Sequence, residues 1–214
     1  MPRWGSGLTG LPDYWAEAVD QLRAADPALG RVIEGCGEGG LVCRDDPFVT
    51  LARSIVGQQI SVRAAATIWS RLEEAVDAVT PEAVSKAGVD RLRGAGLTRQ
   101  KSSYLHDIAG AFAGGDMGPH VWSDADDEAV IEALCGLRGV GRWTAETFLI
   151  FHLLRPDVLP LADIGLRRAV AMTYRSGEET TADHVAEIAE AWRPWRSVAT
   201  WYLWRSLDPE PVAY

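Results

Sequence analysis

Helix-type spacing of apolar residues runs through almost the whole chain, and it limits the possible folds more than any other feature. Apolar residues recur every three or four positions in segments such as 102–115. Segments of this kind begin at typical helix-capping residues: Asp46 before Pro47, Ser61, Thr80 before Pro81, and Ser123. No segment alternates apolar and polar residues between turns, as a half-exposed strand would. The sequence therefore predicts an all-α protein of about ten helices, without strands, internal repeats or low-complexity linkers.

Length and cysteine content indicate the class of protein and its compartment. The 214 residues suffice for one sizeable domain or two small ones that pack closely. No apolar run approaches the roughly 18–20 residues of a membrane span, and residues 1–10 lack the pattern of a signal peptide. Cys36, Cys43 and Cys135 are odd in number and irregular in spacing, which favours neither a disulfide framework nor a four-cysteine cluster. We expect a reduced, cytoplasmic protein with no membrane partner.

The charge is acidic overall but unevenly distributed. The net charge of −9, taken alone, argues against nucleic acid as a partner. Residues 116–132 carry six acidic side chains and no Lys or Arg. In contrast, residues 138–175 carry six arginines against three acids, and residues 90–101 carry four basic side chains against one acid. Two basic segments of this kind can still provide a face for nucleic acid.

Residues 137–146, "LRGVGRWTAE", join two helical segments through a glycine–valine–glycine turn. Glycines allow a hairpin to turn tightly and its backbone to approach a partner closely. The first N–H groups of the following helix point out of the same turn, so they can receive a phosphate oxygen without reading base sequence. An ordinary helical hairpin with a glycine cap is the alternative.

Asp163 follows this hairpin after one helical segment and a loop punctuated by prolines. Its position predicts the N-cap of a helix that begins at Ile164, a role that is often purely structural. In combination, hairpin and aspartate resemble the helix-hairpin-helix DNA glycosylases, whose "LPGVGxxTA"-like hairpin precedes an essential aspartate. The matching residues are Leu137, Gly139, Val140, Gly141, Thr144 and Ala145. Arg138 replaces the usual proline, which should affect the rigidity of the hairpin more than the chemistry.

Three further segments resemble the alkylation-repair type of this family, 3-methyladenine DNA glycosylase II, in a short form without the N-terminal β-domain. Residues 54–61, "SIVGQQIS", resemble the segment that inserts a residue into DNA. Trp143 stands where relatives with lyase activity carry lysine, and residues 191–204 resemble the tryptophan-rich C-terminal segment. The resemblance covers residues 45–207 and implies an all-α, two-lobed fold with a DNA-binding cleft between the lobes.

The resemblance also implies a division of the chain into three segments. Residues 1–44 would form an N-terminal helical segment that packs on the C-terminal lobe. Residues 45–136 would form the helical lobe that carries the DNA wedge. Residues 137–214 would form the lobe with the helix-hairpin-helix and the catalytic residue.

The site residues are carried over from the family by position. Asp163 is the expected catalytic carboxylate, and Trp143 and Trp204 are expected to line the base pocket. Gly139, Val140, Gly141, Arg142 and Thr144 would form the phosphate-binding hairpin. Gln59 would be the wedge and Gln58 would contact the opposite strand, with further DNA contacts from Ser61, Thr98 and Lys101. Core packing is the alternative for the tryptophans, and a position on a helix surface is the alternative for the two glutamines. A wedge is often apolar, so Gln59 departs from the usual pattern.

The chemistry implied by these residues is excision of a cationic base. An alkylated purine is a good leaving group, and aromatic faces hold a cation with roughly 0.5–2 kcal/mol per contact. A fixed carboxylate can stabilise the charge that builds on the sugar and can orient or activate water. A damaged, poorly paired base also leaves the stack at lower cost. The resemblance, with which this chemistry agrees, therefore implies a monofunctional, monomeric DNA glycosylase that excises alkylated bases such as 3-methyladenine from double-stranded DNA in base excision repair.

Two other functions remain open at this stage. One is a relative with another base preference, such as deaminated or oxidised purines. The other is a non-catalytic DNA-binding protein that uses the hairpin as a phosphate clamp, although a clamp needs no carboxylate such as Asp163. We expect no cofactor and no iron–sulfur cluster, because the C-terminal four-cysteine loop of other relatives is missing. The family sometimes holds a monovalent cation on the hairpin carbonyls, and a nucleoid-associated location would follow in a prokaryote.

Overall fold

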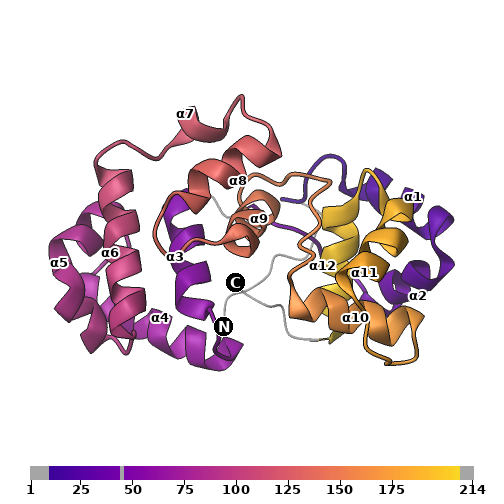
Figure 1. Ribbon diagram of the computed structural model, residues 1–214, viewed down its shortest axis with the longest axis horizontal. Coiled ribbons are helices and arrows are strands. Elements are labelled where there is room, and N and C mark those ends of the chain that lie inside the picture. The colour runs from indigo at the N-terminus through magenta and orange to yellow at the C-terminus, as the bar shows by residue number, and fades with distance from the viewer. Residues whose placement is uncertain (1–9, 44–45, 208–214) are drawn as a thin grey trace. The chain divides into compact units, whose positions relative to one another are not determined.

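The computed structural model describes residues 10–43 and 46–207, and every regular element in these residues is a helix (Figure 1). The helices are α1 (Trp15–Ala25), α2 (Pro27–Cys36), α3 (Pro47–Gly57), α4 (Val62–Val76), α5 (Pro81–Gly94), α6 (Arg99–Ala113), α7 (Pro119–Trp122), α8 (Asp127–Cys135), α9 (Arg142–Phe151), α10 (Ile164–Tyr174), α11 (Ala182–Ala189), the 3₁₀ helix η1 (Glu190–Trp192) and α12 (Arg196–Leu207). The all-α prediction is confirmed. Within the described residues, no helix has the length and apolar character needed to cross a membrane.

Side-chain caps fix where most helices begin, because they satisfy backbone N–H groups that have no partner in the first turn. Asp46 accepts from the N–H of Val49 at 2.9 Å, and Ser61 and Thr80 cap α4 and α5 in the same way, as predicted. The prediction for Ser123 was wrong. Ser123 ends the short helix α7, where its own N–H donates to the carbonyl of Pro119, and Asp126 caps α8.

The described chain divides into two compact units. Unit 1 contains residues 10–43 and 149–207, and unit 2 contains residues 46–148, so the boundary lies within α9. Helices α1 and α2 pack against α12 within unit 1, and α10 packs there as well. The hairpin at 137–141, which the sequence analysis assigned to the C-terminal segment, belongs to unit 2.

Unit 1 is built around α12, which packs against helices from both ends of the chain. The ring of Trp15 in α1 lies 5.4 Å from that of Trp201 and 5.7 Å from that of Tyr202, both in α12. Asp26 is buried between α1 and α2, where its carboxylate accepts from the Tyr174 hydroxyl at 2.6 Å and from the Trp192 indole at 3.0 Å. Burial alone would raise the pKa of Asp26, but these donors and two backbone N–H groups lower it below the usual range.

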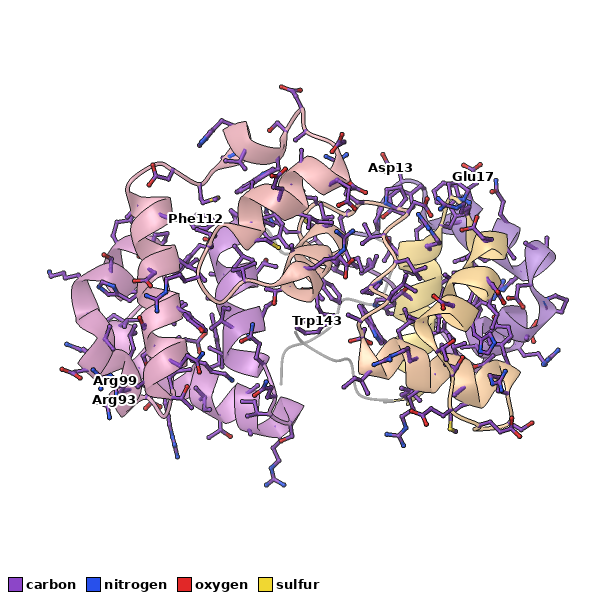
Figure 2. The ribbon with its side chains drawn as sticks, viewed as in Figure 1. Asp13, Glu17, Arg93, Arg99, Phe112 and Trp143 are labelled. Carbon is purple, nitrogen blue, oxygen red and sulfur yellow. The ribbon has the colours of Figure 1, made fainter. Side chains whose placement is uncertain are left out.

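Unit 2 is built around α3, which packs between α4 and α6. Three apolar side chains of α3, those of Phe48, Leu51 and Ile55, are almost completely buried. An aromatic series continues from Phe48 through Phe112 to Trp122 and Phe148, with centroid distances of 5.6, 6.4 and 5.3 Å (Phe112 is labelled in Figure 2). This core anchors α3, which leads into the glutamine segment, and α9, which follows the hairpin.

Candidate active site and nucleic-acid interface

The hairpin between α8 and α9 depends on one of its two glycines for folding. Gly139 has a φ of 88°, and a Cβ there would lie 2.2 Å from the Tyr104 ring, so no other residue fits. Val140 is buried, and its N–H donates to the Leu137 carbonyl at 3.1 Å, which closes the turn. Around Gly141, by contrast, a Cβ would meet no atom within 4 Å. The fold therefore requires glycine at 139, while glycine at 141 leaves open space in front of the first turn of α9.

The side chains of the hairpin face other protein groups. The guanidinium of Arg142 pairs with the carboxylate of Glu128 and, at 3.0 Å, with that of Glu146. The hydrogen bonds to Glu128 are the main cause of the raised pKa of Arg142, and the same hydrogen bonds lower the pKa of Glu128. Thr144 is buried, with 2% of its surface exposed. The contact that such a hairpin offers to a phosphate is thus a backbone contact, with the charge of Arg142 balanced locally.

The two glutamines lie outside the helices, so their alternative as helix-surface residues was wrong. Helix α3 ends at Gly57, and Gln58 is its C-cap. The Gln58 amide nitrogen donates to the Gly139 carbonyl at 3.2 Å and to the Thr144 hydroxyl at 3.3 Å. Gln59 is exposed with a φ of 58°, a left-handed conformation that costs roughly 1–2 kcal/mol for a residue with a side chain. Ile60 is exposed as well, so this turn presents both side chains to solvent.

The three other predicted DNA contacts also have structural roles. Ser61 and Thr98 are the N-caps of α4 and α6. The ammonium of Lys101 donates to the carbonyl oxygens of Val56 at 2.9 Å and Gln58 at 2.6 Å, and its partial burial lowers its pKa. Contacts of these residues with DNA stay predictions.

Unit 2 also carries exposed arginines near the α5–α6 turn. Arg91, Arg93 and Arg99 are exposed, and Figure 2 shows Arg93 and Arg99 at the same end of the helix pair. The charge count of segment 90–101 already marked this region as basic. Sequence reasoning singled out Lys101 instead, because the carbonyl oxygens that bind its ammonium cannot be read from the sequence.

Asp163 caps α10, as predicted, and holds a second partner that the sequence did not reveal. Its Oδ1 accepts from the backbone N–H of Leu166 and, at 2.8 Å, from the indole N–H of Trp204. Trp204 is 7% exposed and stacks on Phe151 at a centroid distance of 5.8 Å. A Cβ at Gly165 would lie 3.1 Å from the same Oδ1, so glycine there leaves room for the carboxylate. Two donors and this close packing fix the orientation of Asp163.

Trp143 lies in the first turn of α9, directly after the hairpin, and is half-buried (Figure 2). It belongs to unit 2, whereas Asp163 and Trp204 belong to unit 1. The roles of Trp143 and Trp204 toward a base stay predictions.

The hairpin carbonyls bear on the predicted monovalent cation. Those of Leu137 and Gly141 each accept one backbone N–H, from Val140 and Ala145, and that of Gly139 accepts the Gln58 amide. A carbonyl oxygen has two lone pairs, so these bonds do not oppose an ion, which stays a prediction. In the described part of the chain, no group of three or more His, Cys, Asp or Glu side chains could hold a metal ion.

Comparison with known proteins places this arrangement in a family. Residues 52–194 match the family model described as HhH-GPD superfamily base excision DNA repair protein. The chain is 30% identical over 203 residues to DNA-3-methyladenine glycosylase 1 of Schizosaccharomyces pombe, covering 93% of this chain and 84% of that protein.

Two solved structures agree with this assignment. The crystal structure of a DNA-3-methyladenine glycosidase from Bacillus halodurans matches with a TM-score of 0.76 and 34% identity, over 89% of each chain. A 3-methyladenine DNA glycosylase from Schizosaccharomyces pombe, in complex with abasic DNA, matches with a TM-score of 0.80 and 28% identity, over 88% of this chain and 95% of that one. The chain therefore belongs to the HhH-GPD superfamily of base excision DNA repair proteins.

Proposed function

We propose that this protein is a DNA glycosylase that excises alkylated bases, of the 3-methyladenine type, from duplex DNA in base excision repair. The family and the names of its relatives support this function. The observation that carries the proposal is the carboxylate of Asp163, held by the Leu166 N–H and the Trp204 indole. A protein that only clamps DNA would not need a carboxylate fixed in this way at the start of α10.

The proposed reaction breaks the bond between C1′ of the sugar and the ring nitrogen of the base. The electron pair of this bond goes to the base and neutralises its positive charge, so little acid assistance is needed. Positive charge builds on the sugar, and the Asp163 carboxylate stabilises it and orients the attacking water. Water adds its oxygen to C1′ and loses a proton, which leaves an abasic site and the released base.

Recognition of the base rests on aromatic side chains in this proposal. A cationic purine is attracted to an electron-rich indole face. Trp143 presents a half-buried indole in the first turn of α9, and Trp204 lies beside Asp163. We assign Trp143 to base contact, and we assign Trp204 both to base contact and to orientation of the carboxylate.

The enzyme is proposed to leave the sugar–phosphate backbone intact. Strand cleavage requires an amine that attacks C1′ and forms a Schiff base. The sequence has two lysines, Lys86 and Lys101. Lys86 is exposed on α5, and the ammonium of Lys101 is bound to two carbonyl oxygens at the end of α3. Neither arrangement suits a nucleophile.

Binding to DNA is proposed to use the glycine hairpin for a phosphate and the turn at 58–61 for insertion into the base stack. Ser61, Thr98 and Lys101 border this turn or the start of α6 and are proposed as further contacts. A cytoplasmic, monomeric protein that works on the nucleoid fits this function. A monovalent cation on the hairpin carbonyls would supply extra positive charge for the phosphate.

A base-release assay over a panel of duplexes tests the function. Each duplex carries one lesion: 3-methyladenine, 7-methylguanine, hypoxanthine or 8-oxoguanine, with an undamaged duplex as control. We expect release of the alkylated bases well above that of the other two. Release of hypoxanthine or 8-oxoguanine alone would change the substrate class, and no release from any duplex, despite tight binding, would make the protein a non-catalytic DNA binder.

A further inference from the structure

Three separate segments of unit 2 meet at Gln58. Its backbone carbonyl accepts from the Lys101 ammonium at 2.6 Å, which joins the end of α3 to the start of α6. Its side-chain amide donates to the Gly139 carbonyl at 3.2 Å and to the Thr144 hydroxyl at 3.3 Å, which joins the end of α3 to the hairpin and to α9. One residue thereby connects the turn at 58–61 with the hairpin.

The hydrogen bond from Lys101 to the Gln58 carbonyl serves to cap the C-terminal end of α3. The hydrogen bond from the Gln58 side chain to the hairpin has no such role. The last carbonyl groups of α3 lack helical partners, and an ammonium is a favourable donor at this negative end of the helix dipole. Lys101 supplies it through Val56 and Gln58. Capping α3 does not require the Gln58 amide to reach across to Gly139. That second contact fixes the turn relative to the hairpin.

The fixed position of Gln58 accounts for the unusual backbone of Gln59. Residues other than glycine persist with positive φ where the surrounding structure imposes it, and such residues cluster at functional sites. Gln58 is held through its backbone and through its side chain, so the chain leaves it in a set direction. The left-handed Gln59 then directs the turn outward, with Gln59 and Ile60 both exposed.

The hairpin is fixed from its other side as well. The Tyr104 ring of α6 packs where a Cβ of residue 139 would be, and Arg138 pairs with Asp107 of the same helix at 2.8 Å. The turn and the hairpin are therefore both attached to α6 and to each other. Each of the two also has exposed residues: Gln59 and Ile60 in the turn, and Gly141 in the hairpin.

We propose that Gln58 is a positioning residue that couples insertion of the 59–60 turn into DNA with the phosphate grip of the hairpin. This inference rests on the proposed function, which assigns DNA contacts to both parts. Because the two contacts are held at a set separation, the hairpin places the turn at a defined base step. Loss of the amide contact should make insertion inefficient even when the duplex is fully bound.

The test uses Gln58→Met, which keeps the length of the side chain and removes the amide donor without adding charge. Insertion is measured as the fluorescence rise of 2-aminopurine placed next to a tetrahydrofuran abasic site at saturating protein. We expect this rise to fall about fivefold or more. Because the duplex is saturated with protein, the loss reports insertion and not occupancy. Gln21→Met, which alters a glutamine of α1 in the other unit, should behave like the parent.

A double-mutant cycle provides the second arm. Gln59→Ala should reduce the fluorescence rise in the parent and add little in Gln58→Met, because the turn is already uncoupled. If Gln58→Met proves unstable, Thr144→Val removes one acceptor with little change of shape and should reduce the rise in the same way, though less. A full fluorescence rise in a folded Gln58→Met or Thr144→Val variant, or independent effects of the two glutamine substitutions, would overturn the coupling.

Failure of the coupling is distinguishable from failure of the proposed function. The fluorescence signal needs no excision, so a parent protein that inserts but releases no base contradicts the function and leaves the coupling intact. A parent that excises 3-methyladenine, together with a Gln58→Met variant that inserts and excises as well as the parent, contradicts the coupling alone.

Discussion

Asp163 and Trp204 form the pair on which the proposed chemistry depends. The N-cap position of Asp163 could be predicted from the sequence, because an N-cap is a local feature and the next residues begin a helix. The bond from the Trp204 indole was not, because the two residues are 41 positions apart and meet only through the packing of α10 against α12. The family resemblance assigned both side chains to one predicted site without revealing that the indole donates to the carboxylate.

Trp204→Phe separates the two functions proposed for this tryptophan. Phenylalanine keeps an aromatic ring against Phe151 but cannot donate to Asp163. A hydrogen bond to a charged group contributes about 1.5–3 kcal/mol, so we expect a roughly 10- to 100-fold slower single-turnover excision of cationic and neutral lesions alike. Trp204→Ala should in addition disfavour cationic lesions, because cation–π attraction is lost with the ring. Parent-like excision by Trp204→Phe would show that the indole N–H has no role in catalysis.

At the scale of elements, the hairpin provides a matched pair of substitutions. Gly139→Ala should destabilise the fold by about 1–3 kcal/mol, because the new methyl group meets Tyr104 and the positive φ disfavours alanine. Gly141→Val should unfold at nearly the same denaturant concentration as the parent, because the space around residue 141 is open.

The same Gly141→Val variant should bind every duplex more weakly, with or without a lesion, because its side chain blocks the approach of a phosphate. Fluorescence anisotropy with lesion-containing and undamaged duplexes measures this effect. Weaker binding to lesion-containing DNA alone would place residue 141 in the base pocket instead.

The connection between α3 and α6 bears on strand cleavage. Borohydride trapping during turnover should give no covalent protein–DNA band, and a denaturing gel run without heat or alkali should show intact strands. The reason is that the Lys101 ammonium is bound to the carbonyls of Val56 and Gln58. A trapped band that disappears in Lys101→Met would contradict the monofunctional mechanism.

Element by element, the sequence predicted helices well where the signal is local and poorly where tertiary contacts decide. The caps at Asp46, Ser61 and Thr80 are properties of one turn each, and they were correct. The start of α8 was misplaced, because Ser123 is the C-cap of the short helix α7 and Asp126 is the N-cap of α8.

The contacts of Lys101 and Gln58 were beyond the reach of the sequence for a related reason. Both depend on how α3, α6 and the hairpin pack in unit 2, and segments so far apart in the chain carry no common pattern. The hairpin itself was predictable, because its glycines and the start of α9 are adjacent in sequence.

At the scale of the whole molecule, the net charge of −9 has to be reconciled with a DNA substrate. Four arginines form ion pairs with carboxylates: Arg138 with Asp107, Arg142 with Glu128 and Glu146, and both Arg193 and Arg196 with Asp157. Pairing makes these four side chains less available to release counterions from DNA. Backbone contacts at the hairpin and insertion at the turn would have to supply more of the affinity.

The salt dependence of binding measures this balance. We expect the slope of log K against log salt to be about −3 or shallower, since each neutralised phosphate contributes about −0.9. Anisotropy titrations with an undamaged duplex between about 50 and 200 mM salt give the slope. A slope near about −8 would mean that many more basic side chains bind phosphate than the paired arginines suggest.

In the proposed mechanism the charge of Asp163 drives base release, and Asp163→Asn removes that charge while keeping the size of the side chain. The amide oxygen of asparagine can still accept from the Leu166 N–H and the Trp204 indole, so fold and binding to an abasic duplex should be retained. Single-turnover release of 3-methyladenine from a duplex should fall by a factor of about 10³, because transition-state stabilisation by the carboxylate is lost. Release by folded Asp163→Asn at a rate comparable to that of the parent would contradict this mechanism.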